Sequence, residues 1–182
     1  MKVTPTRIKD VLRIEPNVHR DERGFFLETW HEARLASQGI DARFVQDNRS
    51  HSVRGTLRGL HYQLETPQGK LLQVVSGTVY DVAVDLRRSS PTFGRWVAET
   101  LSAENQLQLW IPPGFAHGFY VVSPSADVLY KCTAYYAPAR DRALRWDDPE
   151  LGIPWPLISG CPPLLSAKDA GAPALREAET YR

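Results

Sequence analysis

The amino-acid sequence predicts an all-β fold, a double-sheet jelly-roll barrel with a few short helices. Short stretches rich in Val, Leu, Tyr and Phe recur along the chain, and turns containing Pro, Gly and Ser separate them. Helical periodicity is sparse, and strands do not alternate with helices as they do in a parallel sheet. The length of 182 residues favours one domain over residues 1–182, with a sizeable core.

The expected elements follow in chain order. The segment TWHEARLASQG (29–39) is a helix candidate that Gly39 ends. Two strands flank Ser76-Gly77, a pair typical of a two-residue hairpin turn. A Pro- and Gly-rich region follows the strands and is expected to wrap the surface. The expected strands cover 70–75, 78–86, 95–101, 107–111, 118–122 and 127–136, and the C-terminal part 147–182 is loop with a short helix at 174–181.

The strand at 78–86 alternates in a way that assigns its two faces. Side chains at every second position of a strand share a face. We therefore expect Tyr80, Val82, Val84 and Leu86 on one face, and Asp81, Ala83 and Asp85 on the other.

Composition excludes several classes of partner. Hydrophobic residues make up 42% and charged residues 24%, which is ordinary for a soluble domain. The net charge of +1 gives no strong field for nucleic acid or an anionic membrane. No apolar run approaches the ~20 residues of a spanning helix, and the N-terminus lacks the apolar core of a signal peptide. Two cysteines without a CxxC pair favour a reducing, cytoplasmic location.

Two motifs place histidines in the predicted barrel. RGLHYQ (58–63) and PPGFAHGF (112–119) occupy the places of the two halves of the cupin signature, so a cupin-type barrel is expected. Metal-binding cupins carry His-x-His in the first half, but here the sequence is His61-Tyr62-Gln63. A catalytic metal requires about three protein ligands, and His61 and His117 are only two. We therefore expect no metal, and no Gly-rich fingerprint indicates a dinucleotide cofactor.

His61 has two interpretations. An imidazole with an ordinary pKa of about 6.5 is suited to act as a general base. The alternative is a core histidine bonded to a backbone carbonyl, which local sequence alone favours. Regular strand geometry would send Arg58 and His61 to opposite faces, unless a bulge or a late strand start at Gly59 brings both inward.

Other candidate residues also have a structural alternative. Lys70 is either a solvated strand-end lysine or a cation near a developing oxyanion. Tyr130 is either a packed aromatic with a bonded hydroxyl or a proton donor. Asp169 either closes a helix capping box with Ser166 or orients an imidazole.

Three basic residues also have two interpretations. Arg23, Arg58 and Lys168 are either simply exposed or together hold a diphosphate, which arginine binds well through bidentate contacts.

Motifs along most of the chain closely resemble the dTDP-4-dehydrorhamnose 3,5-epimerase family. The resemblance runs in order from about residue 3 to residue 176, with little insertion or deletion, which makes it far more specific than any single motif. The segments that carry it are DERGFF (21–26), FVQDN (44–48), LRGLHYQ (57–63), PQGKLLQVVSG (67–77), VYDVAVDLR (79–87), SPTFGRW (90–96), LWIPPGFAHGF (109–119), LYK (129–131) and LSAKDA (165–170).

The resemblance implies a metal-free, cofactor-independent cupin isomerase that forms homodimers, with an N-terminal segment joining the partner's sheet. Its implied substrate is dTDP-4-dehydro-6-deoxy-D-glucose and its product dTDP-4-dehydro-L-rhamnose. His61 would be the base, Asp169 its orienting carboxylate, Tyr130 the proton donor, and Lys70 the cation that stabilises the enolate. Asp81 would partner His117, and Asp141 stands where relatives often have Glu. The implied substrate contacts are Arg23, Glu28, Gln46, Asp47, Asn48, Arg58, His117, Asp141 and Lys168.

Three alternatives to a double epimerase remain at this point. A single 3- or 5-epimerase of a deoxysugar pathway would use largely the same residues. A metal-dependent cupin enzyme is disfavoured by Gln63. A non-catalytic nucleotide-sugar binding module would have no need of a base and an acid, which His61 and Tyr130 could supply.

Overall fold

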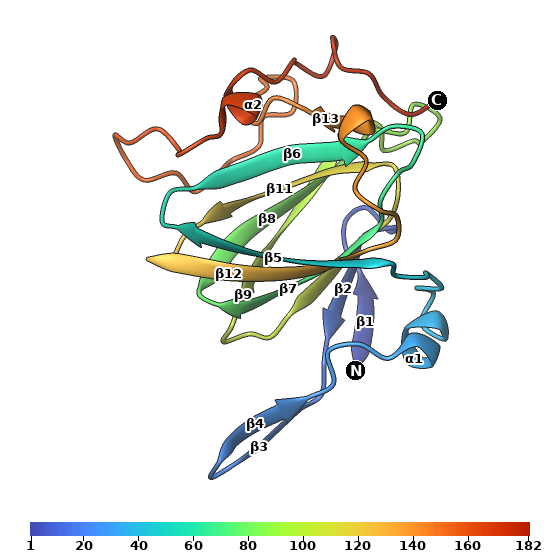
Figure 1. Ribbon diagram of the computed structural model, residues 1–182, viewed down its shortest axis with the longest axis vertical. Coiled ribbons are helices and arrows are strands. Elements are labelled where there is room, and N and C mark those ends of the chain that lie inside the picture. Colours follow the sequence, from blue (N-terminus) through green and yellow to red (C-terminus); the bar gives the residue numbers. More distant parts are fainter.

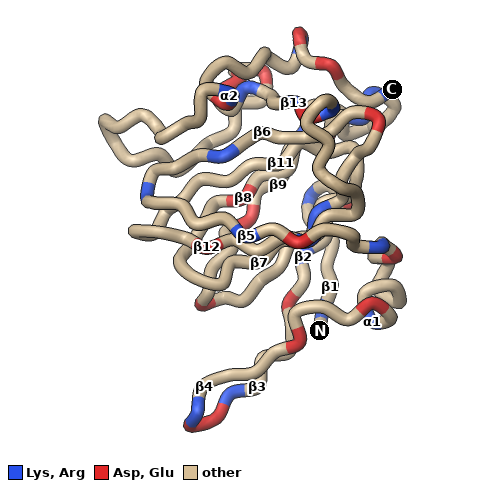
Figure 2. The backbone as a smooth tube through the Cα atoms, viewed as in Figure 1, with Lys and Arg blue, Asp and Glu red and all other residues tan.

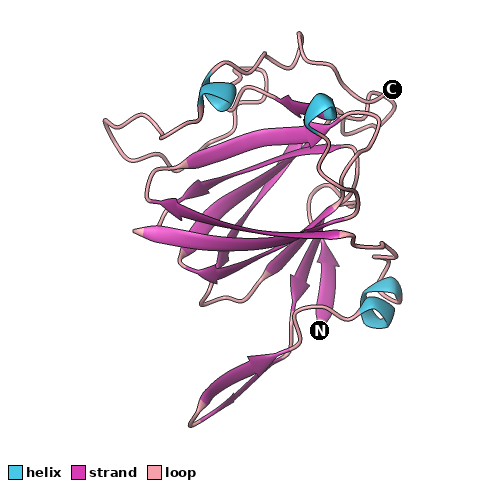
Figure 3. Ribbon diagram, viewed as in Figure 1, coloured by secondary structure: helices cyan, strands magenta, loops and turns pink.

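The computed structural model describes residues 1–182, and strands dominate it (Figure 3). Two antiparallel sheets face one another, and a separate two-stranded hairpin extends from them (Figure 1). The order of the larger sheet is β1-β2-β10-β7-β12-β5, and that of the smaller sheet is β13-β6-β11-β8-β9. This arrangement confirms the predicted all-β, cupin-type double-sheet fold.

The bounds of the strands show where each sheet draws its residues. The six-stranded sheet contains β1 (Lys2–Pro5), β2 (Leu12–Glu15), β5 (Gln46–Val53), β7 (Lys70–Ser76), β10 (Gln108–Ile111) and β12 (Ser125–Cys132). The five-stranded sheet contains β6 (Leu57–Gln63), β8 (Thr78–Asp85), β9 (Trp96–Ser102), β11 (Phe115–Val121) and β13 (Asp141–Ala143). The separate hairpin consists of β3 (Val18–Asp21) and β4 (Gly24–Leu27).

Three apolar clusters hold these layers together. The largest fills the space between the sheets, and a second packs the outer face of the five-stranded sheet against the C-terminal segment. The third fixes helix α1 (Glu32–Ala36) on the outer face of the six-stranded sheet through Leu35 and Trp110. The predicted faces of β8 are confirmed, because Ala83 lies in the inter-sheet cluster and Val82 in the C-terminal one.

The hairpin expected at Ser76-Gly77 is wrong. β7 and β8 are consecutive, but they belong to different sheets and do not pair. Gly77 has a φ of +75°, and a Cβ there would lie 2.0 Å from the carbonyl oxygen of Ser125. The chain therefore crosses between the sheets in a space that only glycine fits, and burial of both strands in opposite sheets overrides the local turn signal.

The helices are shorter than expected. α1 covers only Glu32–Ala36, because His31 caps its N-terminus. The helix expected at 174–181 is wrong: this segment makes turns, and Tyr181 instead pairs with Arg87 in an isolated bridge. The C-terminal helix is α2 (Ala167–Ala170), inside the region expected to be loop, and a 3₁₀ turn covers Pro138–Arg140.

The strand expected at 127–136 ends early, at Cys132. Its partners end at the same level, since Cys132 lies opposite Gln46 of β5 and Lys70 of β7. Residues 133–136 therefore leave the sheet and form a loop beside the barrel.

The β3–β4 hairpin extends well away from the two sheets (Figure 1). Its tip carries charges of both signs (Figure 2). Two aromatic side chains on β4, Phe25 and Phe26, are 52% and 70% exposed. A two-stranded ribbon of this kind has little stability of its own, so this arm needs a further surface to cover it.

Every helix is short: α1, the longest, has five residues, so no helix of the structure could cross a bilayer.

Candidate active site

A cavity of about 320 Å³ lies at one end of the barrel, between the two sheets and the C-terminal segment. It gathers five of the residues predicted from the sequence. β6 of the smaller sheet supplies His61, and β7 and β12 of the larger sheet supply Lys70 and Tyr130. The lining residues are His61, Tyr62, Gln63, Gln68, Lys70, Tyr130, Tyr136, Asp141 and Lys168.

A bulge in β6 brings Arg58 and His61 to the same side. The four residues of β6 from Arg58 to His61 lie opposite only three residues of β11, His117 to Phe119, so the register shifts there. Gly59 has a φ of +130°, and a Cβ at this position would lie 2.5 Å from the Cα of Gly118. Arg58 then reaches across to the other sheet, where its Nε donates to Ser52 Oγ at 2.9 Å. The bulge expected at Gly59 is confirmed.

His61 forms a dyad with Asp169 and not a bond to a backbone carbonyl. The Nε2–H of His61 donates to Asp169 Oδ1 at 2.5 Å. A carboxylate only accepts, so this bond places the proton on Nε2 and leaves the Nδ1 lone pair free. Burial raises the pKa of Asp169, but hydrogen bonds and charge from His61, with bonds from Ser166 and Gly59, outweigh it, so this pKa lies below its ordinary value.

Asp169 takes part in the cap of α2 through its backbone and orients the imidazole through its side chain, so its carboxylate does not close the capping box with the Ser166 backbone N–H. Ser166 Oγ caps α2 by accepting from the Asp169 backbone N–H at 3.1 Å. The same residue's carboxylate, 3% exposed, accepts from His61. The helix cap therefore fixes the residue while its side chain orients the imidazole.

Lys70 is a buried amine that no side chain pairs with. It is 8% exposed and begins β7 at the edge of the cavity, so the solvated-lysine alternative is wrong. Burial lowers its pKa below the ordinary value of 10.5, although the charges of Cys132, Asp81 and Asp141 counteract this shift. A buried cation without a partner is suited to a negative charge supplied by a ligand.

Tyr130 faces the same cavity from the opposite sheet. It packs against the inter-sheet cluster, and its hydroxyl has no hydrogen-bond partner in the chain. Burial raises its pKa, and the nearby guanidinium of Arg58 partly offsets this. The phenol is therefore protonated at neutral pH and faces the cavity from the side opposite the β6 imidazole.

His117 and Asp81 form a second, fully buried pair. His117 Nε2–H donates to Asp81 Oδ2 at 2.9 Å, and His117 lies directly opposite His61 in the β11–β6 pairing. Burial lowers the pKa of His117, while Asp81 raises it and Lys70 lowers it further. Each of the two histidines is thus bonded to its own carboxylate, and no three His, Cys, Asp or Glu side chains converge on one point.

One wall of the cavity is built from Asp141, Lys168 and Tyr136. Asp141 Oδ2 accepts from Lys168 Nζ at 2.5 Å and from the Tyr136 hydroxyl at 3.0 Å. The shorter Asp141 side chain therefore still reaches the cavity. Tyr136 was missed by the sequence analysis, which placed it inside a strand. No local signal in the sequence indicates it, because the end of β12 at Cys132 is set by the pairing with β5 and β7.

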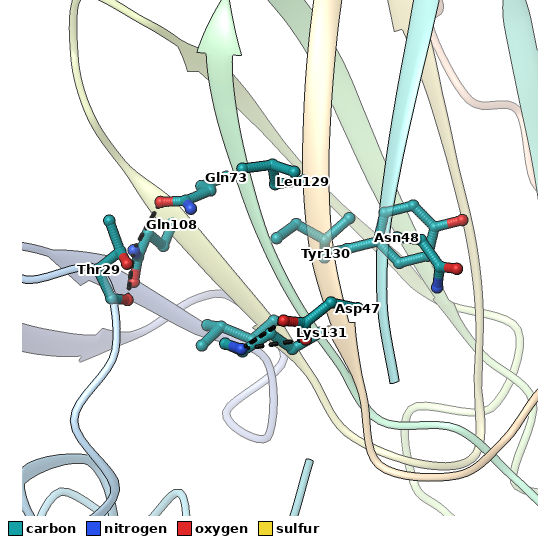
Figure 4. Close-up of a pocket in the computed structure, with 10 residues that line it drawn as sticks. Thr29, Asp47, Asn48, Gln73, Gln108, Leu129, Tyr130 and Lys131 are labelled. Carbon is teal, nitrogen blue, oxygen red and sulfur yellow. Dashed lines mark hydrogen bonds and ion pairs between the residues drawn. The ribbon is translucent and has the colours of Figure 1, made fainter. Parts of the chain in front are cut away.

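Three neighbouring residues of β5 divide between two faces. Asn48 lies opposite Tyr130 in the β12–β5 pairing, and its Oδ1 accepts a hydrogen bond from Gln46 Nε2 at 3.0 Å. Asp47 points the other way and pairs with Lys131 at 3.0 Å (Figure 4). There it lines a second hollow of about 220 Å³ on the outer face of the sheet. Asp47 is therefore not brought to the His61 cavity.

Arg23 and Glu28 also lie away from the cavity. Arg23 sits on the β3–β4 arm, where its side chain is 85% exposed and pairs with Asp21. Glu28 follows the arm and pairs with Arg34 of α1. One chain alone therefore does not assemble the expected group of Arg23, Arg58 and Lys168.

Comparison with known proteins assigns the family. A family model described as dTDP-4-dehydrorhamnose 3,5-epimerase matches residues 5–177. The chain belongs to this family. A relative of that name from Pseudomonas aeruginosa is 53% identical over 182 residues, which covers 100% of this chain and 99% of the relative.

Solved epimerase structures share the fold closely. A dTDP-6-deoxy-D-glucose-3,5-epimerase from Legionella pneumophila, in complex with dTDP-4-keto-L-rhamnose, has a TM-score of 0.96 and 50% identity, covering 100% of this chain and 97% of the other. A 3′-monoepimerase from Streptomyces bikiniensis, in complex with dTDP-quinovose, has a TM-score of 0.87 and 37% identity, covering 95% and 87%. The epimerase family therefore includes single and double epimerases on one fold.

Proposed function

We propose that this protein is a dTDP-4-dehydrorhamnose 3,5-epimerase acting on dTDP-4-dehydro-6-deoxy-D-glucose. The observation that carries the proposal is the pairing of a base and an acid from opposite sheets. His61 on β6 and Tyr130 on β12 face one cavity, with the buried amine of Lys70 at its edge. Membership of the epimerase family and 53% identity over the whole chain support the same reaction.

The chemistry requires this arrangement. The C4 ketone of the sugar acidifies the protons at C3 and C5. Removal of either proton places negative charge on the C4 oxygen, and inversion requires a proton to return on the other face. At each carbon, His61 Nδ1, freed by the Nε2 bond to Asp169, takes the proton from one face, and the Tyr130 phenol delivers a proton to the other face. The imidazolium then loses its proton to solvent and the phenolate takes one up, which restores both groups for the next inversion. Each positioned acid or base contributes roughly 10²–10⁴-fold.

Lys70 stabilises the enolate in this mechanism. Its ammonium group is buried and has no protein partner, so the developing charge on the C4 oxygen would satisfy it. Electrostatic stabilisation of this kind is strong in a site that excludes water. His117, whose Nε2–H is bonded to Asp81, lies directly opposite His61 in the β11–β6 pairing. No redox change is needed in either inversion.

Polar residues at the rim fit the nucleotide part of the substrate. Arg58 and Lys168 are cations near the cavity, and arginine and lysine bind diphosphate well. The exposed ring of Tyr136 offers a flat surface to the base, and Gln46 and Asn48 lie beside it. Within the proposal, Arg23, Glu28 and Asp47 act on the substrate only if a second chain completes the site.

A homodimer is part of the proposal. The β3–β4 arm presents Phe25 and Phe26 to solvent and carries Arg23 away from its own barrel. A second copy that receives the arm would bury both aromatic rings and bring Arg23 toward a cavity. We also propose a cytoplasmic location, because Cys132 and Cys161 are unpaired, as is usual in a reducing compartment.

The decisive experiment is proton NMR of the protein with dTDP-4-dehydro-6-deoxy-D-glucose in D₂O. We expect loss of both the H3 and the H5 signals, with conversion to the L-sugar. Exchange at one carbon only would instead indicate a single epimerase, as in the 3′-monoepimerase relative. No exchange at either carbon, from a folded protein that binds dTDP, would overturn the enzymatic proposal.

The matched control for this experiment is His61→Asn. The variant keeps a polar side chain of similar size but has no basic nitrogen, so the folded protein should lose nearly all exchange at both carbons. Substantial exchange at either carbon in this variant would show that another group removes the proton.

A further inference from the structure

Gln63 is a buried polar side chain next to the cavity for which the proposed reaction has no direct use. It lies on β6 two residues after His61 and is 2% exposed. Both ends of its amide are bonded. Nε2 donates to the carbonyl oxygens of Thr66 at 3.0 Å and Tyr135 at 3.2 Å, and Oε1 accepts from the Ala137 N–H at 2.8 Å. This set satisfies the group completely, so it is a built feature of the fold.

Two of these bonds hold the residues on either side of Tyr136. The loop at 133–137 has no strand partner, because β12 ends at Cys132. The backbone N–H of Tyr136 donates to Gln46 Oε1 at 2.8 Å, and its hydroxyl reaches Asp141. Without Gln63, Tyr136 itself would be held only by the bond from its backbone N–H to Gln46 and by the bond from its exposed hydroxyl to Asp141. Gln68 and Gly69 bond to Ala134 and Thr133 at the start of the loop, so Gln63 holds the part of the loop around Tyr136.

The backbone of Gln63 is fixed in turn by the C-terminal segment. The Tyr181 hydroxyl donates to the Gln63 carbonyl oxygen at 2.7 Å, and the neighbouring Tyr62 hydroxyl donates to the Glu179 carbonyl oxygen at 2.6 Å. The C-terminal segment therefore fixes the end of β6 from the outer side of the sheet, and the Gln63 amide fixes the 133–137 loop from the opposite side.

We propose that Gln63 is a positioning residue that sets Tyr136 at the mouth of the cavity relative to His61. The inference rests on the proposed function, since the task of Tyr136 is to hold the nucleotide sugar. At this position metal-binding cupins carry their second histidine. Here an amide occupies it and fixes a loop of the binding site.

The expected effect is on binding and not on proton transfer. Tyr136 makes no contact with His61, Lys70 or Tyr130 in the hydrogen-bond network, and its ring is 54% exposed at the cavity mouth. A displaced Tyr136 should therefore weaken substrate binding while the base, acid and cation stay in place.

The test compares Gln63→Met with the wild type in steady-state epimerisation of dTDP-4-dehydro-6-deoxy-D-glucose. Methionine has nearly the same length but cannot make the three bonds. We expect KM to rise about tenfold or more while kcat changes less than about threefold. In a Tyr136→Ala background the same change should alter KM less than about twofold, because a residue that acts through Tyr136 has nothing left to position.

A second variant and a control separate positioning from general stability. Gln63→Glu keeps the acceptor for Ala137 but places a carboxylate against two carbonyl oxygens. Its KM ratio to wild type should fall as the pH is lowered, because a protonated Glu can donate again. The control is Asp148→Ala, which removes another buried side chain with three backbone bonds, far from the cavity. Asp148 does not line the cavity, so this variant should lower Tm and leave KM unchanged.

Three outcomes would overturn the inference. The first is an unchanged KM in folded Gln63→Met or Gln63→Glu. The second is an equal rise in KM with and without Tyr136. The third is a rise in KM for Asp148→Ala as large as that for the Gln63 variants. If the wild type shows no turnover of this substrate, the proposed function is wrong and the inference is rejected with it. If the wild type turns over the substrate and any of the three outcomes is seen, only the inference is rejected.

Discussion

At the scale of single residues, burial decides which titratable groups are available for chemistry. Lys70 and Tyr130 are polar, largely removed from water and without protein partners, so each retains bonding capacity for a ligand. His117 Nε2–H is used by Asp81 Oδ2, while Asp81 Oδ1 is buried without a hydrogen-bond partner. His61 is intermediate, since one ring nitrogen is fixed by Asp169 and the other is free.

Asp169→Asn should reduce kcat by roughly 10²–10⁴-fold and leave the fold intact. The amide can still accept from His61, but it removes the negative charge that stabilises the imidazolium formed when the substrate loses its proton. Ser166 still caps α2, because it accepts from the backbone N–H of residue 169. Steady-state kinetics and a thermal melt check both points, and Asp147→Asn, at an exposed pair with Arg145, is the matched control.

Deprotonation of Lys70 should reduce the activity of the enzyme at an alkaline pH that lies below 10.5. Burial lowers its pKa, so the ammonium loses its proton, and its charge, at a lower pH than an exposed lysine. We expect kcat/KM to fall as the pH rises through this pKa. Lys70→Arg keeps a permanent charge, so any residual activity should lose this alkaline limit. An identical alkaline limb in both proteins would assign the limit to another group.

At the scale of elements, irregular features place the reactive side chains. The β6 bulge at Gly59 turns Arg58 and His61 to one side, and the Gly77 crossing sends β7 and β8 into different sheets. Because of this crossing, Lys70 of β7 lines the cavity from one sheet, while Asp81 of β8 holds His117 within the other. A regular hairpin would have put both residues in the same sheet.

The segment that joins β8 to β9 is fixed by a buried carboxylate, which should appear in the acid stability of the protein. Burial raises the pKa of Asp85, but hydrogen bonds from Arg87, Ser90 and Thr92 outweigh it and lower the pKa to about 2. Because the folded pKa lies below the unfolded value of 3.8, the ionised carboxylate stabilises the fold above that pH, by about 2 kcal/mol.

Asp85→Asn should therefore lower the free energy of unfolding by about 2 kcal/mol at pH 7. The difference from wild type should shrink as the pH falls from about 4 toward 2, where the wild-type carboxylate takes up its proton. Urea unfolding at a series of pH values measures this. The exposed Asp41→Asn is the control, and a difference that stays constant with pH would rule out the ionisation as its source.

At the scale of the whole molecule, the arm and the cavity belong to different parts of one chain. The β3–β4 arm, whose turn contains Arg23, extends away from the barrel and from β6, the strand that contains His61 (Figure 1). The proposed dimer resolves this separation, because the arm of one subunit would complete the site of the other.

Two inactive variants should restore activity when they share a dimer. We expect His61→Asn and Arg23→Ala each to be strongly impaired alone. In a mixed dimer, one site would contain both defects and the other neither. Random mixing makes half of the dimers mixed, so coexpression should give about a quarter of wild-type activity. Activity no higher than the average of the two variants would contradict a site shared between subunits.

The sequence by itself determined the all-β class, the alternation of β8, the pairing of Asp169 with His61 and the family. These features depend on local periodicity and on short motifs, both of which can be recognised in the sequence without knowledge of the fold. The tertiary structure alone decided the partners of β7 and β8, the ends of β12 and α1, the outward direction of Asp47, and the site of the C-terminal helix. Each of these depends on which residues compete for the same buried space, and Gln63 and Tyr136 acquire their roles only where β6 and the 133–137 loop meet.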